Sequence, residues 1–166
     1  MRVDVFELGR TAASVQGALD LGAAPRLRES LADERGSITF RFDGLIDDQG
    51  RPGALLRLDG EVRIRCDRCG EPLAYSLDHA ARFQFVDHEA ELARLPVTVD
   101  DVEALIGSAS FDLAQLVEDE VILILPLSPR HERCGAPVRA GDADERPNAF
   151  AMLRDFEPRR RSKDRH

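Results

Sequence analysis

Three stretches in the middle of the chain alternate apolar and polar residues, and this alternation constrains the fold more than any other feature. They cover residues 38–43, 56–64 and 73–85. A period of two is typical of a strand with one buried and one water-facing side. The connections between the stretches are short and contain turn-forming residues, namely Gly50, Pro52 and Gly53 in the first and Gly70 and Pro72 in the second. Short connections favour antiparallel neighbours, so the sequence predicts an antiparallel β meander with one exposed face.

Residues 112–125 have the pattern of an amphipathic helix. Asp112 and Gln115 have the spacing of a helix-capping pair. An apolar stripe at helical spacing follows, made of Leu113, Leu116, Val117, Val121 and Ile124. We expect this helix to pack on the apolar face of the meander, with shorter helices at both ends of the chain, within residues 7–34 and 148–156. The predicted fold class is therefore α+β.

The length of 166 residues predicts a single domain. We place this domain at residues 1–157, with a long acidic loop at 87–110 and a flexible loop at 135–147. Residues 158–166 are expected to form a basic, disordered tail.

The net charge of −8 argues against a protein that is held to nucleic acid mainly by a uniform positive surface. Adjacent carboxylates, such as Glu118, Asp119 and Glu120, are expected to lie on a solvated face. The chain contains neither a P-loop nor a Gly-x-Gly-x-x-Gly motif, so no nucleotide cofactor is expected. Because no set of catalytic residues emerges either, we expect a binding protein and not an enzyme.

Membrane insertion and secretion are not expected from this sequence. The longest strongly apolar run, residues 121–127, is far too short to cross a bilayer. No secretory signal opens the chain, and its three cysteines cannot all pair within one molecule. These features favour a reduced, cytoplasmic protein.

A Cys-x-x-Cys-Gly motif, formed by Cys66, Cys69 and Gly70, lies between the second and third predicted strands. Two sulfurs at this spacing can bind one metal ion, and the glycine permits the tight backbone of a zinc knuckle. His131 and Cys134 would complete a Cys3His zinc site if the segment after the helix meets this turn. Two other interpretations remain: the cysteines are inert core residues, or they form a redox pair. A redox pair is the least favoured, because such sites lie at the start of a helix that follows a parallel strand.

Two groups of basic residues are candidates for contact with RNA or with a protein partner. Arg65 and Arg68 belong to the Cys-x-x-Cys turn, and the tail carries Arg159, Arg160, Arg161 and Lys163. A tethered basic tail would bind RNA phosphates in a salt-dependent, sequence-independent manner; the alternative is a terminus that only aids solubility. The acidic body would suit a basic protein partner, such as a ribosomal protein.

Three motifs in this order resemble the bacterial YceD family. Residues 65–72 are similar to its C-x-R-C-x-x-P signature, and residues 112–134 are similar to its helix, Leu-Pro-Leu and Pro-Arg-His segments. Residues 148–153 are similar to its Asn-Pro-Phe-Ala-x-Leu ending, with Ala149 where proline is common. The chain also lacks a cysteine-richer stretch that some branches carry after Leu-Pro-Leu, and keeps only Cys134 there.

The resemblance implies a protein that supports the synthesis, processing or stability of 23S rRNA, and it implies no catalytic residue. We therefore expect a non-enzymatic ribosome biogenesis factor whose partner is ribosomal RNA or a basic protein of the large subunit. The alternatives are a zinc-stabilised adaptor and a thiol-dependent redox protein that uses the Cys-x-x-Cys turn.

Overall fold

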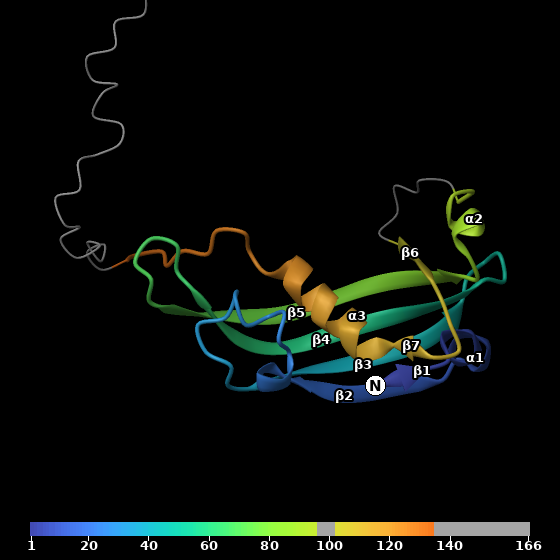
Figure 1. Cartoon of the computed structure of the whole chain (residues 1–166), viewed down its shortest axis with the longest axis horizontal. Helices are drawn as coiled ribbons and strands as arrows, with labels where there is room; N and C mark the ends of the chain where they lie inside the picture. The colour runs from blue at the N-terminus through green and yellow to red at the C-terminus, as the bar shows by residue number, and fades with distance from the viewer. Residues whose placement is uncertain (96–101, 135–166) are drawn as a thin grey trace, which may run out of the picture. The chain divides into compact units, whose positions relative to one another are not determined.

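The three alternating stretches form the centre of a β-sheet. The structure is a computed structural model and describes residues 1–95 and 102–134. Strands β3 (Ser37–Ile46), β4 (Pro52–Arg65) and β5 (Pro72–Val86) follow one another as antiparallel neighbours (Figure 1). The predicted meander is therefore confirmed. Its apolar side carries the largest fully buried side chains of the sheet, Phe42, Phe83 and Phe85.

The sheet has two further strands, so the order is β2-β3-β4-β5-β6. Strand β2 (Ser14–Asp20) pairs antiparallel with β3, whereas β6 (Val102–Ile106) pairs parallel with β5. The sheet is thus mixed, and the fold class is α+β as predicted.

Two local expectations were wrong in part. A short helix, α1 (Val5–Thr11), lies near the N-terminus as expected, but the stretch expected to be helical also contains β2. Val15 and Leu19 are four residues apart, and this spacing fits one side of a strand as well as one face of a helix. The expected loop at 87–110 contains the short helix α2 (Glu89–Leu92) and the strand β6. The strand has only five residues, too few for a clear alternation of apolar and polar residues within an acidic, mixed segment.

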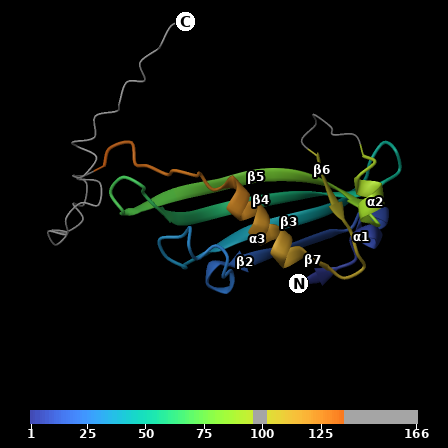
Figure 2. The ribbon, with the colours of Figure 1, turned by 45° about the horizontal axis from the view of Figure 1, so that its top comes forward.

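Helix α3 (Leu113–Ile124) lies across one face of the sheet (Figures 1 and 2). Asp112 caps its first turn, where the carboxylate accepts a hydrogen bond from the main-chain N–H of Gln115 at 3.3 Å. The predicted apolar stripe is the buried face: Leu113, Leu116, Val117 and Val121 are buried, and Ile124 is half-buried. The predicted helix and its orientation are confirmed.

The N-terminal residues fix the start of α3 and one end of the sheet. Strand β1 (Arg2–Val3) pairs with β7 (Phe111–Asp112), directly before α3. Helix α1 (Val5–Thr11) packs so closely on β3 that a Cβ atom at Gly44 would lie 2.1 Å from the carbonyl oxygen of Leu8. Only glycine can occupy that position without moving α1.

Residues 21–36 cover the sheet beside α3. They form a short β-bridge to the end of β4, between Leu31 and Ile64. They begin with a single 3-10 turn, η1 (Leu21–Ala23), and bury Leu21, Leu27 and Leu31. The main-chain N–H of Arg26 donates to the Glu118 carboxylate at 2.8 Å, and the Arg26 guanidinium pairs with Asp119. Glu118 is therefore buried with a hydrogen-bond partner, and the expectation that it is solvated was wrong.

Glu120 is buried too, which corrects the same expectation. Its carboxylate lies 3.6 Å from the ring Nε2 of His79 on β5. Burial raises the pKa of this carboxyl, Glu103 raises it further, and His79 opposes both. The ionised form of Glu120 is thus less stable in the fold than in water.

The residues that the structure describes belong to one compact unit. The predicted loop at 135–147, the helix within 148–156 and the basic tail lie outside the described residues. Within the described part of the chain, no helix is long and apolar enough to cross a membrane.

The packing of α3 is tested by placing a charge on its two faces. Leu116 is 7 % exposed and Leu123 is 70 % exposed. Leu116→Asp should lower the free energy of unfolding by several kcal/mol, enough to unfold a domain of ordinary stability, because the carboxylate would be buried without a partner. Leu123→Asp on the same helix is the matched control and should change stability little. Urea unfolding followed by circular dichroism measures both, and equal midpoints would show that the wrong face has been placed inside.

The burial of Glu120 predicts a loss of folding stability that depends on pH, because the pKa of this carboxyl is raised in the fold. At low pH the carboxyl is protonated in the folded and in the unfolded protein, and the loss is absent. The loss develops as the pH rises through the unfolded pKa of about 4.3. Glu120→Gln should therefore be more stable than the wild type at pH 7, and the difference should narrow toward pH 4. Glu61→Gln, at an exposed position of β4, is the control for the loss of one negative charge and should change stability little at pH 7. Denaturant midpoints across this pH range decide the matter, and a difference that grows on acidification would contradict the assignment.

Candidate metal centre

Three cysteines and one histidine meet at the end of the sheet. Cys66 and Cys69 lie in the turn between β4 and β5, whereas His131 and Cys134 belong to the segment after α3. Both ribbon views show that segment beside the turn (Figures 1 and 2). One ligand atom from each residue lies within 4.8 Å of all the others. The structure thus brings together the four residues that the sequence singled out.

The turn owes its shape to two main-chain hydrogen bonds. The N–H of Cys66 donates to the carbonyl of Glu71 at 3.0 Å, and the N–H of Gly70 donates to the carbonyl of Cys66 at 2.8 Å. Gly70 has a φ of +77°, in the left-handed region that favours glycine. Both sulfur-bearing residues of this turn are buried. The glycine after the second cysteine therefore allows the tight turn that the motif predicts.

The segment after α3 reaches the turn through two further hydrogen bonds. The N–H of Asp67 donates to the carbonyl of Pro129 at 2.8 Å. The ring Nε2 of His131 lies 3.2 Å from the carbonyl oxygen of Pro72, which can only accept, so Nε2 carries the proton. This leaves the Nδ1 lone pair of His131 available, and Nδ1 faces the sulfur of Cys69 at 3.4 Å. A backbone carbonyl on the second ring nitrogen is the usual support of a metal-binding histidine.

The separations of the ligand atoms fit a shared metal ion better than a covalent bond. The sulfurs of Cys66 and Cys134 are 3.5 Å apart, far beyond a disulfide length of about 2.05 Å. Around a tetrahedral ion with bonds of about 2.0 to 2.3 Å, neighbouring ligand atoms are about 3.5 Å apart. The cluster is close enough to hold a metal ion, and it is compatible with zinc.

The electrostatics of the cluster act in opposite directions on the thiols of Cys66 and Cys134. Burial raises the pKa of the Cys66 thiol, but the main-chain N–H groups of His131, Cys69 and Arg68 and the Cys134 thiol outweigh it and lower the pKa to about 5. Burial and the two neighbouring sulfurs raise the pKa of Cys134. A bound cation would lower the pKa of both thiols, because it favours the deprotonated form of every ligand.

The basic residues predicted from the sequence are placed only in part. Arg65 ends β4 and Arg68 lies in the turn, and both are exposed. Arg159, Arg160, Arg161 and Lys163 lie outside the described residues. Sequence reasoning missed Arg130 and Arg133, which are exposed beside His131 and Cys134. A simple signal could have found them, since an arginine directly precedes each of the four candidate ligands.

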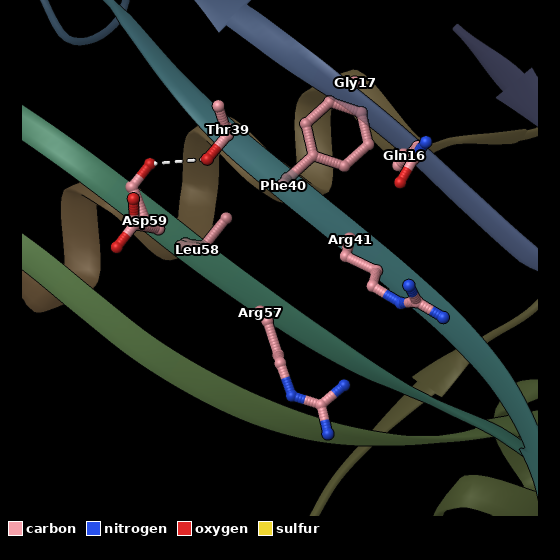
Figure 3. A pocket seen from close by; sticks show the side chains of 8 residues that line it. All are labelled: Gln16, Gly17, Thr39, Phe40, Arg41, Arg57, Leu58 and Asp59. Atoms are coloured by element: carbon pink, nitrogen blue, oxygen red, sulfur yellow. Dashed lines mark hydrogen bonds between the residues drawn. The ribbon is translucent and has the colours of Figure 1, made fainter.

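A hollow of about 560 Å³ over β2, β3 and β4 is a weaker candidate site (Figure 3). Its two arginines, Arg41 and Arg57, both bind the carboxylate of Asp43 at 2.8 Å. The ring of Phe40 lies over Gly17, where a Cβ atom would be only 2.9 Å away. The two arginines of this hollow are thus paired within the protein, and its shape follows from sheet packing.

Comparison with known proteins agrees with these features. The sequence model of the family described as "Large ribosomal RNA subunit accumulation protein YceD" matches residues 55–157. The chain is similar to a protein of that name from Haemophilus influenzae, with 30 % identity over 145 residues, 77 % of this chain and 78 % of the relative. No solved structure matches the chain. The match includes all four candidate ligands and α3, and the chain belongs to the YceD family.

Proposed function

We propose that this protein is a ribosome biogenesis factor that supports the accumulation of 23S rRNA, the large RNA of the large ribosomal subunit. The family match over residues 55–157 carries this proposal, because the family is named for accumulation of that RNA. The same role would place the protein in the cytoplasm. Its partner is ribosomal RNA or a basic protein of the large subunit.

We propose further that it acts as a binding module and not as an enzyme. The cluster offers three sulfurs and one nitrogen to a metal ion, and these fill all four positions of a tetrahedral site. Catalytic zinc sites keep a position open for water or substrate, whereas structural sites are closed by protein ligands. A closed Cys3His site therefore supports a structural role.

The metal that best fits this ligand set is zinc, which accepts thiolate and imidazole ligands without a redox change. It would connect the β4–β5 turn to the segment after α3, which is otherwise attached there by the hydrogen bonds of Asp67 and His131. Each such bond stabilises by only about 1 kcal/mol. Zinc would therefore hold this end of the domain together.

A thiol-dependent redox protein is the second candidate, and the low pKa of the Cys66 thiol, about 5, favours it. The same thiolate character is expected of a metal ligand, however. The Cys-x-x-Cys motif lies in a turn between antiparallel strands, not at the start of a helix, and this position favours the metal.

The zinc proposal predicts about one equivalent of zinc in the purified full-length protein. Cys134→Ser and His131→Ala should each lose most of it, because a missing ligand opens the site. Elemental analysis measures the metal, and thermal unfolding before and after a chelator measures its contribution to stability. His88→Ala, at an exposed histidine away from the cluster, is the matched control and should keep the metal.

Less than a tenth of an equivalent of zinc in a normally folded wild-type protein would contradict the proposal. If the zinc-free protein also reacted with iodoacetamide at Cys66 near pH 6 and cycled through a disulfide, the redox candidate would replace it.

The proposed role predicts a selective shortage of 23S rRNA in cells that lack the protein. The ratio of 23S to 16S rRNA, measured with precursors resolved, should fall and should return to normal with the wild-type gene. The 16S rRNA serves as the internal control for general loss of RNA. An unchanged ratio under several growth conditions would contradict the proposed function.

A further inference from the structure

An arginine directly precedes each candidate metal ligand, and the four form one group: Arg65, Arg68, Arg130 and Arg133. We call this group the arginine ring. All four side chains are exposed. Within residues 1–95 and 102–134, no carboxylate lies within ion-pair distance of any of them.

Most other arginines of the described chain have a carboxylate partner. Arg41 and Arg57 share Asp43, and Arg63 pairs with Asp33. The arginine ring therefore differs from most arginines of the described chain, because none of its four side chains forms an ion pair there. Unpaired cations that are gathered on one surface are available to an anionic ligand.

The local charge is positive although the chain carries −8. Residues 65–69 and 130–134 hold the four arginines against Asp67 and Glu132, a balance of +2. A divalent ion with three thiolates and a neutral histidine adds −1, so the surface stays at +1 when the site is filled. The ligand must be polyanionic and must contact this end of the molecule, because the acidic body would repel it elsewhere.

The metal cluster limits how far apart the four arginines can be. The ligand atoms lie within 4.8 Å of one another, and each arginine is one residue from its ligand. One step along the chain is about 3.8 Å and each ligand atom lies about 3 Å from its own Cα atom, so the four arginine Cα atoms lie within roughly 18 Å of one another. Such a span matches several consecutive phosphates of a nucleic-acid strand.

We propose that the arginine ring is a binding site for the phosphate backbone of RNA, and that the metal centre positions it by joining the two arginine-bearing segments. Guanidinium groups bind phosphate oxygens through two parallel hydrogen bonds, which makes arginine well suited to this contact. The choice of RNA over other polyanions rests on the proposed function. Contacts to phosphate carry no sequence information by themselves.

The proposal is tested with the zinc-loaded full-length protein and a fluorescein-labelled single-stranded RNA of mixed sequence, by fluorescence anisotropy between 50 and 200 mM salt. Four phosphate contacts at about −0.7 each contribute about −2.8 to the slope of log affinity against log salt, which is about a 50-fold loss over this range. Changing all four ring arginines to glutamine should make the slope shallower by about 2.8.

A matched control removes the same charge elsewhere, at four exposed arginines that are not next to the cluster: Arg28→Gln, Arg35→Gln, Arg82→Gln and Arg94→Gln. This variant should keep the wild-type slope. An equal loss in both variants would overturn the proposal, because binding would then follow overall charge. An unchanged slope in the ring variant would overturn it directly.

The positioning role of the metal is tested with Cys134→Ser, with circular dichroism to confirm that the sheet is folded. Release of the segment that carries Arg130 and Arg133 should make the slope shallower by about half as much, roughly 1.4. The full wild-type slope in the zinc-free variant would overturn this role. Displacement of the RNA by an equal charge of polyglutamate would show that an acidic protein, and not RNA, is the ligand.

The same variants separate this proposal from the proposed function. If the ring variant binds RNA like the wild type while deletion of the gene still lowers the 23S to 16S ratio, the arginine site fails and the biogenesis role stands. If deletion leaves that ratio unchanged while the ring variant loses its salt-dependent binding, the RNA site stands and the biogenesis role fails.

Discussion

The structure depends on the covering of the apolar face of the sheet. The sheet presents Phe42, Phe83 and Phe85 on one side, and α3 covers them with Leu113, Leu116, Val117 and Val121. This packing fixes the place on the sheet at which α3 ends, with Ile124, and from which the following segment starts. Five residues lie between Leu125 and His131. The six steps from one to the other span about 20 Å at most in a fully extended chain. The position of α3 on the sheet therefore decides whether His131 and Cys134 can reach the β4–β5 turn.

Much of the sheet and the main helix could be predicted because their sequence periods are long and unambiguous. Strands of ten or more residues repeat the alternation many times, whereas Val15 and Leu19 in β2 fit a strand and a helix equally well. The burial of Glu118 and Glu120 could not be predicted, because their partners, Arg26 and His79, lie far away in the chain. The Cys-x-x-Cys turn was a local signal. Its closure by His131 and Cys134 depended on topology, which local spacing does not determine.

The groups that support the ligand atoms of the cluster belong to the main chain. The main-chain N–H groups of His131, Cys69 and Arg68 lower the pKa of the Cys66 thiol. A carbonyl at the start of β5 orients the His131 ring. These donors and acceptors belong to the backbone, so they place no demand on the side chains beside the ligands. The arginine side chains at those positions are thus not needed to hold the ligand atoms in place.

This support by the backbone bears on why an arginine directly precedes each of the four candidate ligands. A role in charge compensation of the thiolates would require guanidinium groups near the sulfurs, yet the cations are exposed and Cys66 and Cys69 are buried. A role in solubility would not require them to be gathered, because scattered exposed arginines such as Arg35 and Arg82 serve it equally well. What the gathered arrangement provides is a positive surface of limited size on an acidic protein, and its geometry depends on the metal that joins its two halves. A protein with such a surface binds a polyanion at one end and repels it everywhere else, which orients the complex as well as forming it.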